Sequence, residues 1–84
     1  MPQVMYRREI DELKAFNRDI AWFQANYEKL KESYKAEYVA IQNRKVIGHA
    51  KYARALVRSL RSKRYDPSKL VVEYINPTHK VFVL

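Results

Sequence analysis

The chain has 84 residues, no cysteine and a net charge of +8. Its length allows one domain, residues 1–84, and the missing cysteines exclude a disulfide framework, a thiolate metal site and a cysteine nucleophile. No apolar run approaches the roughly 20 residues that span a bilayer, so we expect no membrane as a partner. The N-terminal stretch carries acids where a secretion signal needs apolar residues, which predicts a cytoplasmic protein.

The first half of the chain has the periodicity of a long helix. Apolar residues recur at spacings of three and four, at Leu13, Phe16, Ile20, Phe23, Tyr27, Leu30 and Tyr34. Residues 1–18 form a helical extension in this interpretation, and Asn26 can begin a second helical segment as its N-cap. Such spacing suits both a helix that crosses a sheet and a helix in a coiled coil. We assign Phe23, Tyr27 and Leu30 to the core, and the candidate dimer interface is Leu13, Phe16 and Ile20.

A β-hairpin is expected next, with strands over residues 37–42 and 45–50 and a turn at Asn43-Arg44. Because arginine adopts a positive φ reluctantly, a two-residue type I′ turn competes with a loop of three or four residues. Pairing centred on the turn predicts one face made of Val39, Ile41, Val46 and Gly48 and another made of Tyr38, Ala40, Ile47 and His49. Both faces are largely apolar, so we expect helices on one and a second subunit on the other.

The second half completes an α+β fold of order α-β-β-α-β(-β). A helix is expected over residues 52–63, with a buried stripe of Ala53, Leu56, Val57 and Leu60. A strand follows over residues 70–75, and residues 80–84 can return as a fourth strand or continue as an extended tail. A third strand beside the first gives an antiparallel sheet of order 2-1-3 with helices on one face, and we expect its crossover to be right-handed. We favour this order because the alternative, 1-2-3, would contain a parallel pair in a very small sheet.

A set of positions between residues 19 and 77 follows a recognisable pattern: Trp22, Asn26-Tyr27, Leu30, Tyr34, Tyr38-Val39-Ala40-Ile41, Asn43, His49, Asp66-Pro67 and Val71-Val72. On these positions the chain resembles a family of small prokaryotic domains of unknown function. Ala36, Arg44 and Ala50 stand where that family usually has glycine. The resemblance implies the architecture and no reaction. Some members look like companions of aspartic-protease-like proteins, which implies a role in protein interaction.

Residues suited to catalysis do not form a pattern. His49 and His79 are isolated in the sequence, so their spacing suggests no metal site, and we expect no cofactor. The acids Asp11, Glu12 and Asp19 are expected on a solvated helix face, not in an acid–base pair. For His49 we expect a hydrogen-bonded structural role. The sequence therefore predicts that the protein is not an enzyme.

Charge is the strongest indication of function. Residues 36–84 carry ten Lys or Arg against three Asp or Glu, and residues 38–65 contain no acid. The candidate residues for binding a nucleic acid or an acidic partner are Arg44, Lys45, Lys51, Arg54, Arg58, Arg61 and Arg64. Tyr52 and Tyr65 can offer faces for stacking. The competing interpretation is that these charges only solvate an amphipathic helix.

These features predict a small non-enzymatic interaction module that self-associates as a homodimer and binds a protein partner. A chain of this size buries only roughly 64% of its unfolded surface, so association would add stability. The alternative is a nucleic-acid-binding protein that uses the basic hairpin–helix surface of residues 44–64.

Overall fold

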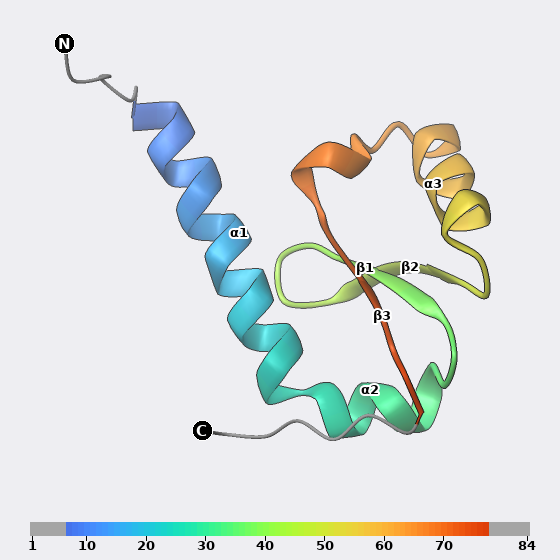
Figure 1. Cartoon of the computed structure of the whole chain (residues 1–84). Coiled ribbons are helices and arrows are strands. Elements are labelled where there is room, and N and C mark those ends of the chain that lie inside the picture. The colour runs from blue at the N-terminus through green and yellow to red at the C-terminus, as the bar shows by residue number, and fades with distance from the viewer. Residues whose placement is uncertain (1–6, 78–84) are drawn as a thin grey trace, which may run out of the picture.

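A computed structural model describes residues 7–77 of the chain, with side chains from residue 10 onward (Figure 1). The elements are α1 (Arg7–Ala25), α2 (Tyr27–Ser33), β1 (Tyr38–Ile41), β2 (Val46–Ala50), α3 (Ala53–Ser62), a short 3-10 helix η1 (Pro67–Lys69) and β3 (Val71–Tyr74). Both strand pairs are antiparallel and the sheet order is β2-β1-β3. The predicted α+β class and the strand order 2-1-3 are therefore confirmed. The expected fourth strand at residues 80–84 lies outside the described residues.

The break between α1 and α2 falls at Asn26, where the chain changes direction (Figure 1). The Asn26 side chain makes no capping bond to α2. Instead its Nδ2 donates to the Trp22 carbonyl at 2.8 Å, and its backbone N–H donates to the same carbonyl at 3.0 Å. Asn26 does occupy the N-cap position before α2, as predicted, but the predicted capping bond is wrong because its side chain bonds back to the end of α1.

Each face of the sheet carries its own core. On one face, Val39 and Ile41 of β1 pack against α1 and α2 in what we call the α1–α2 core, whose buried members are Phe23, Tyr27, Leu30, Val39, Ile41, Val71 and Ile75. On the other face, Ala40 packs beneath α3 in the α3 core, whose buried members are Ala40, Leu56, Leu60 and Leu70. The prediction that Phe23, Tyr27 and Leu30 lie in the core is confirmed.

The expectation of helices on one face only is wrong, and the topology gives the reason. Strands β2 and β3 both pair antiparallel with β1, so they run parallel to each other on either side of it. The chain must cross over β1 to connect them, and α3 is that crossover. It covers one face and leaves the other to α1 and α2. No second subunit is needed to cover a bare face of the sheet.

Of the two hairpin connections that the sequence left open, the structure has the two-residue turn. Asn43 and Arg44 have φ values of 53° and 58°, and Gln42 and Lys45 exchange backbone hydrogen bonds of 3.0 and 3.2 Å. Positive φ at both central residues is the signature of a type I′ turn, whose twist matches that of the flanking strands. The turn thus forms even with arginine at a position that favours glycine.

A β-bulge in β2 changes which side chains face each core. Ile41 pairs with Val46, but Ala40 pairs with Gly48, so Ile47 is an extra residue in β2. The slip brings Gly48 under α3 and turns His49 to the other face. The predicted faces of Gly48 and His49 are therefore wrong.

Candidate interaction surfaces

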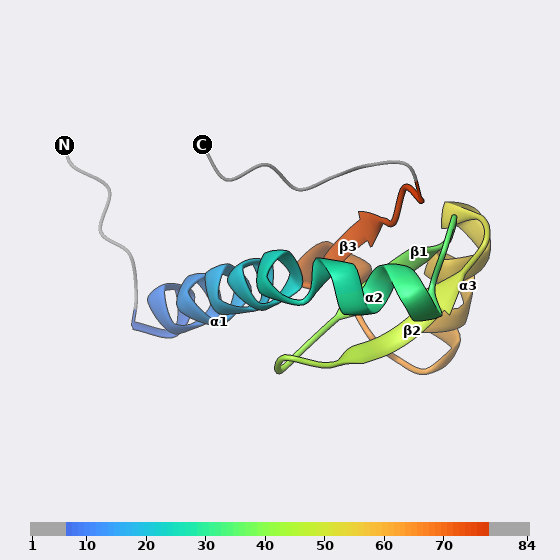
Figure 2. The same cartoon turned by 90° about the horizontal axis from the view of Figure 1, so that it is seen from below.

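The N-terminal half of α1 extends past the sheet, at the end of the molecule away from α3 (Figures 1 and 2). Ile10 is 37% exposed and Leu13 is 48% exposed there. Of the other predicted interface residues, Phe16 and Ile20 are half-buried against the α1–α2 core. The exposed apolar surface of α1 therefore consists of Ile10 and Leu13. Ile10 was absent from the predicted set, although it lies three residues before Leu13 on the same helical stripe.

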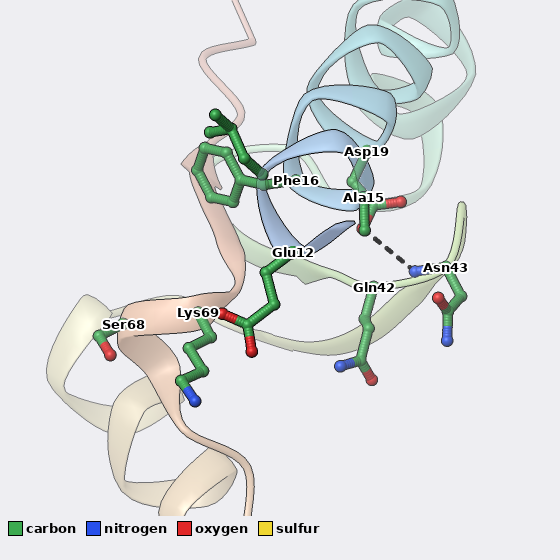
Figure 3. A pocket seen from close by; sticks show the side chains of 9 residues that line it. Glu12, Ala15, Phe16, Asp19, Gln42, Asn43, Ser68 and Lys69 are labelled. Atoms are coloured by element: carbon green, nitrogen blue, oxygen red, sulfur yellow. Dashed lines mark hydrogen bonds between the residues drawn. The ribbon is translucent and has the colours of Figure 1, made fainter. Parts of the chain in front are cut away.

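A pocket of ≈ 470 Å³ lies beside this surface, between α1, the hairpin turn and η1 (Figure 3). Its walls are Glu12, Leu13, Ala15, Phe16, Asp19, Gln42, Asn43, Ser68 and Lys69. Figure 3 shows the side chains of Glu12, Gln42 and Lys69 reaching from three different elements toward the same space. The lining offers hydrogen bonds, charge and an apolar wall, which is the composition of a recognition site. In residues 7–77 no group of His, Cys, Asp or Glu is arranged to hold a metal ion.

Asp19 fastens α1 to the hairpin turn. Its Oδ1 accepts the backbone N–H of Arg44 at 2.8 Å. Its Oδ2 accepts the backbone N–H of Asn43 at 3.2 Å, the bond that Figure 3 shows as a dashed line. Successive residues in a tight turn direct their amides to one side, where a carboxylate can accept both. Asp19 is only 7% exposed, so its expected place on a solvated face is wrong. It lies at the edge of the buried stripe of α1, between Phe16 and Phe23.

The predicted basic residues fall into two separate groups. Arg44 and Lys45 lie at the hairpin turn beside α1, whereas Lys51 follows the other end of β2 (Figure 1). The five residues of β2 lie between Lys45 and Lys51, and six steps of extended chain span roughly 20 Å. The hairpin turn and the start of α3 are thus at opposite ends of β2, and they do not form one continuous surface.

The outward side of α3 carries the second group. Arg54, Arg58 and Arg61 are exposed, and the buried Leu56 and Leu60 occupy the opposite side of the helix. We call the surface made of Lys51, Tyr52, Arg54, Arg58 and Arg61 the α3 cationic face. Within the described part of the chain, no ion pair involves any of these arginines. Hollows of ≈ 380 and ≈ 410 Å³ flank Arg54 and Arg58.

Tyr65 and Arg64, which the sequence also suggested for binding, have structural roles at the end of α3. Tyr65 is half-buried against the α3 core, so its ring is not a free stacking face. Arg64 follows Lys63, the C-cap of α3, and has a φ of 67°. The Arg64 N–H donates to the Arg61 carbonyl, and the Tyr65 N–H donates to the Leu60 carbonyl. This pair of bonds is the helix ending that usually takes glycine. The Arg64 side chain itself is exposed.

His49 is part of a small polar cluster on the face of the sheet opposite α3. Its Nδ1 lies 2.9 Å from Glu37 Oε1, and its ring centroid lies 4.9 Å from that of Tyr34. The expected hydrogen-bonded role of His49 is confirmed. Since the imidazole is exposed, the contact resembles a surface ion pair more than a catalytic dyad.

Comparison with known proteins gives one match. A family model described as "Family of unknown function (DUF5678)" matches residues 29–78, more than half of the chain. Neither the curated proteins nor the solved structures yield a match. Among residues 7–77, no helix has both the length and the apolar character that crossing a membrane requires.

Proposed function

Since this chain belongs to the family of unknown function DUF5678, we propose its role from its surfaces: a non-catalytic interaction module that self-associates through α1. The observation that carries the proposal is the exposed pair Ile10 and Leu13 on the part of α1 that extends past the sheet. A partner that covers Ile10 and Leu13 would remove these apolar side chains from water, which favours association.

A second copy of the chain is the occupant that fits this surface best. Between residues 10 and 18, α1 carries two acids, Asp11 and Glu12, and two bases, Lys14 and Arg18. That segment is neutral, whereas the whole chain has a net charge of +8, so two copies meet there with the least repulsion. In a twofold dimer the same patch serves both copies. The pocket beside Leu13 offers room for an apolar side chain of the second helix.

Sedimentation at micromolar concentration tests self-association. We expect about twice the chain mass for the natural sequence and about the chain mass for the double variant Ile10→Lys, Leu13→Lys, which should stay folded but melt at a lower temperature that no longer depends on protein concentration. Phe16 is left intact because it packs against the core. Gln24→Lys is the matched control, since it adds a lysine to an exposed position near the other end of α1. A natural sequence that sediments as a monomer at every concentration would contradict the proposal.

Nucleic-acid binding through the α3 cationic face is the second candidate function. The supporting observation is that Arg54, Arg58 and Arg61 are exposed in a stretch of chain without acids and have no ion-pair partner among the described residues. Basic residues that neutralise phosphates release counterions, which makes binding strongly dependent on salt. An acidic protein surface is the competing ligand for the same charges.

Titration of a labelled nucleic acid at several salt concentrations tests this candidate. Changing all three arginines to Gln should remove most binding. The control variant Lys29→Gln, Lys35→Gln, Lys45→Gln removes the same charge from exposed positions outside α3 and should keep most of it. Equal losses in the two variants, with binding that disappears at physiological salt, would mean that the charges on α3 only solvate the helix.

A further inference from the structure

We infer that the α3 cationic face takes a single-stranded nucleic acid, with phosphates on its arginines and a base stacked on Tyr52. The inference rests on the second proposed function and names its ligand. Tyr52 is 65% exposed, which is the highest value among the exposed large hydrophobic side chains of the described residues. A solvated aromatic ring at the start of a row of three arginines, none of which has an ion-pair partner among the described residues, combines the two features that bind single strands, a stacking platform and a path of positive charge.

The Tyr52 side chain neither caps α3 nor packs in a core. Tyr52 is the N-cap of α3, a position where Ser, Thr, Asp or Asn would accept a free amide of the first turn. Its side chain makes no capping hydrogen bond. It is absent from the residues packed against either core, so neither capping nor burial accounts for this side chain.

Tyr52 shares a hollow with two of the arginines. The ≈ 380 Å³ hollow is lined by Tyr52, Arg54, Ala55 and Arg58. Arg61 continues the line, and the three arginines extend over about 10 Å of helix. Each strand of a duplex carries a phosphate about every 3.4 Å of its axis, so this length faces more than one phosphate. A base in the hollow would thus have phosphates within reach of the arginines.

The ring also lies within a positive field. Lys51 Nζ is 5.8 Å from the centroid of the Tyr52 ring. An ammonium over one face of the ring leaves the other face for a base and adds one more positive charge for the backbone. A duplex cannot use the ring in this way, because its bases are already stacked on each other. An acidic protein would use the charges but would have no need of the ring.

Fluorescence anisotropy with a labelled single-stranded oligonucleotide tests the inference, against a duplex of equal length, an abasic strand and poly-glutamate. For three arginines and Lys51 on a single strand, log affinity should fall against log salt with a slope of about −2.8. Tyr52→Ala should weaken binding of the single strand about 5- to 150-fold without changing that slope, because stacking releases no ions. Tyr52→Phe keeps the ring and should bind like the natural sequence.

The outcomes separate this inference from the function on which it rests. Equal affinity for duplex and single strand, together with an unchanged affinity of Tyr52→Ala, would overturn the inference. Loss of binding in the triple Gln variant would in that case still support nucleic-acid binding. Poly-glutamate binding as tightly as the oligonucleotide would overturn both in favour of an acidic protein partner. Loss of the Tyr52→Ala effect on the abasic strand would support the inference, because only the stacking contact needs a base.

Discussion

The carboxylate of Asp19 in α1 accepts the backbone N–H of Arg44 in the hairpin turn at 2.8 Å, across 25 residues of chain. A second bond of 3.2 Å reaches the N–H of Asn43. Through these two bonds the first helix holds a turn in which both residues have positive φ. The same contact forms one wall of the pocket beside Leu13, so the hairpin and the proposed dimer surface depend on one side chain.

Asp19→Ala should lower the free energy of unfolding by about 1–3 kcal/mol, because two turn amides lose a charged acceptor. Asp19→Asn keeps one acceptor oxygen and should lose less. Asp11→Ala, an exposed acid on the same helix, should stay within about 0.5 kcal/mol of the natural sequence. Urea denaturation of the three variants measures the differences. Equal stabilities for Asp19→Ala and Asp11→Ala would refute the tethering role.

Arg44→Gly should raise the free energy of unfolding. A non-glycine residue in the left-handed region costs about 1–2 kcal/mol, and glycine loses about 0.5–1 kcal/mol of that advantage through its freedom in the unfolded chain. We therefore expect a gain of about 0.5–1 kcal/mol by thermal or urea unfolding, and a similar gain for Ala36→Gly, where φ is 58°. The N–H that bonds Asp19 is unchanged by the substitution at Arg44.

Lys45→Gly is the control for this effect, since Lys45 is not among the residues with positive φ. Glycine there only adds freedom to the unfolded chain and should be destabilising. A loss of stability in all three glycine variants would show that the turns are not strained at Arg44 and Ala36.

The elements and their order were predictable from local patterns. Helical periodicity predicted α1 and α3, and alternation and turn residues predicted the three strands. Order 2-1-3 was favoured because the alternative needs a parallel pair in a very small sheet. The type I′ turn was also among the alternatives, because Asn43 tolerates a positive φ. Two of the three positions where the family usually has glycine, Ala36 and Arg44, have a positive φ, which glycine adopts easily, whereas Ala50 in β2 does not.

Three features depended on contacts between distant parts of the chain. The sequence around Asp19 predicts a solvated acid, because its hydrogen-bond partners lie 24 and 25 residues away in the chain. The bulge at Ile47 places Gly48 beneath Leu56 and Leu60 of α3, a contact that a register counted from the turn does not contain. The basic residues between Arg44 and Arg64 are close in sequence, but β2 separates them into two groups at its opposite ends. Tertiary structure decided each of these cases.

Acid should destabilise the turn before β3. The Ser68 hydroxyl donates to Asp66 Oδ1 at 2.7 Å and the Ser68 N–H donates at 3.0 Å, and these bonds, with the charges of Lys69 and Arg61, hold the pKa of Asp66 below its ordinary value. A lowered pKa in the folded state stabilises the fold above the pKa of the unfolded state. That contribution is lost as pH falls through the folded value.

Ser68→Ala removes the largest cause of this shift, so the pKa of Asp66 should rise toward its ordinary value. NMR titration of the Asp66 carboxyl measures it directly. Ser68→Thr keeps a hydroxyl and should titrate like the natural sequence. An Asp66 pKa that is the same in the alanine and threonine variants would show that the hydroxyl bond does not form in solution.

Gly48→Val tests the bulge and the position of α3 together. A Cβ on Gly48 would lie 3.2 Å from Leu56 Cδ1 and 3.4 Å from Leu60 Cδ2, and both leucines are fully buried. Because valine would place extra atoms against two fully buried side chains, it should cost about 1–3 kcal/mol of stability through overpacking. Urea denaturation gives the difference in free energy.

His49→Val is the matched control, because the bulge places His49 on the other face with an exposed side chain. A change there should stay within about 0.5 kcal/mol, apart from the loss of the exposed contact with Glu37. A hairpin without the bulge predicts the reverse, since His49 would then point toward α3 and Gly48 away from it. A large loss for His49→Val and a small one for Gly48→Val would therefore establish the regular register and remove α3 from its place above Gly48.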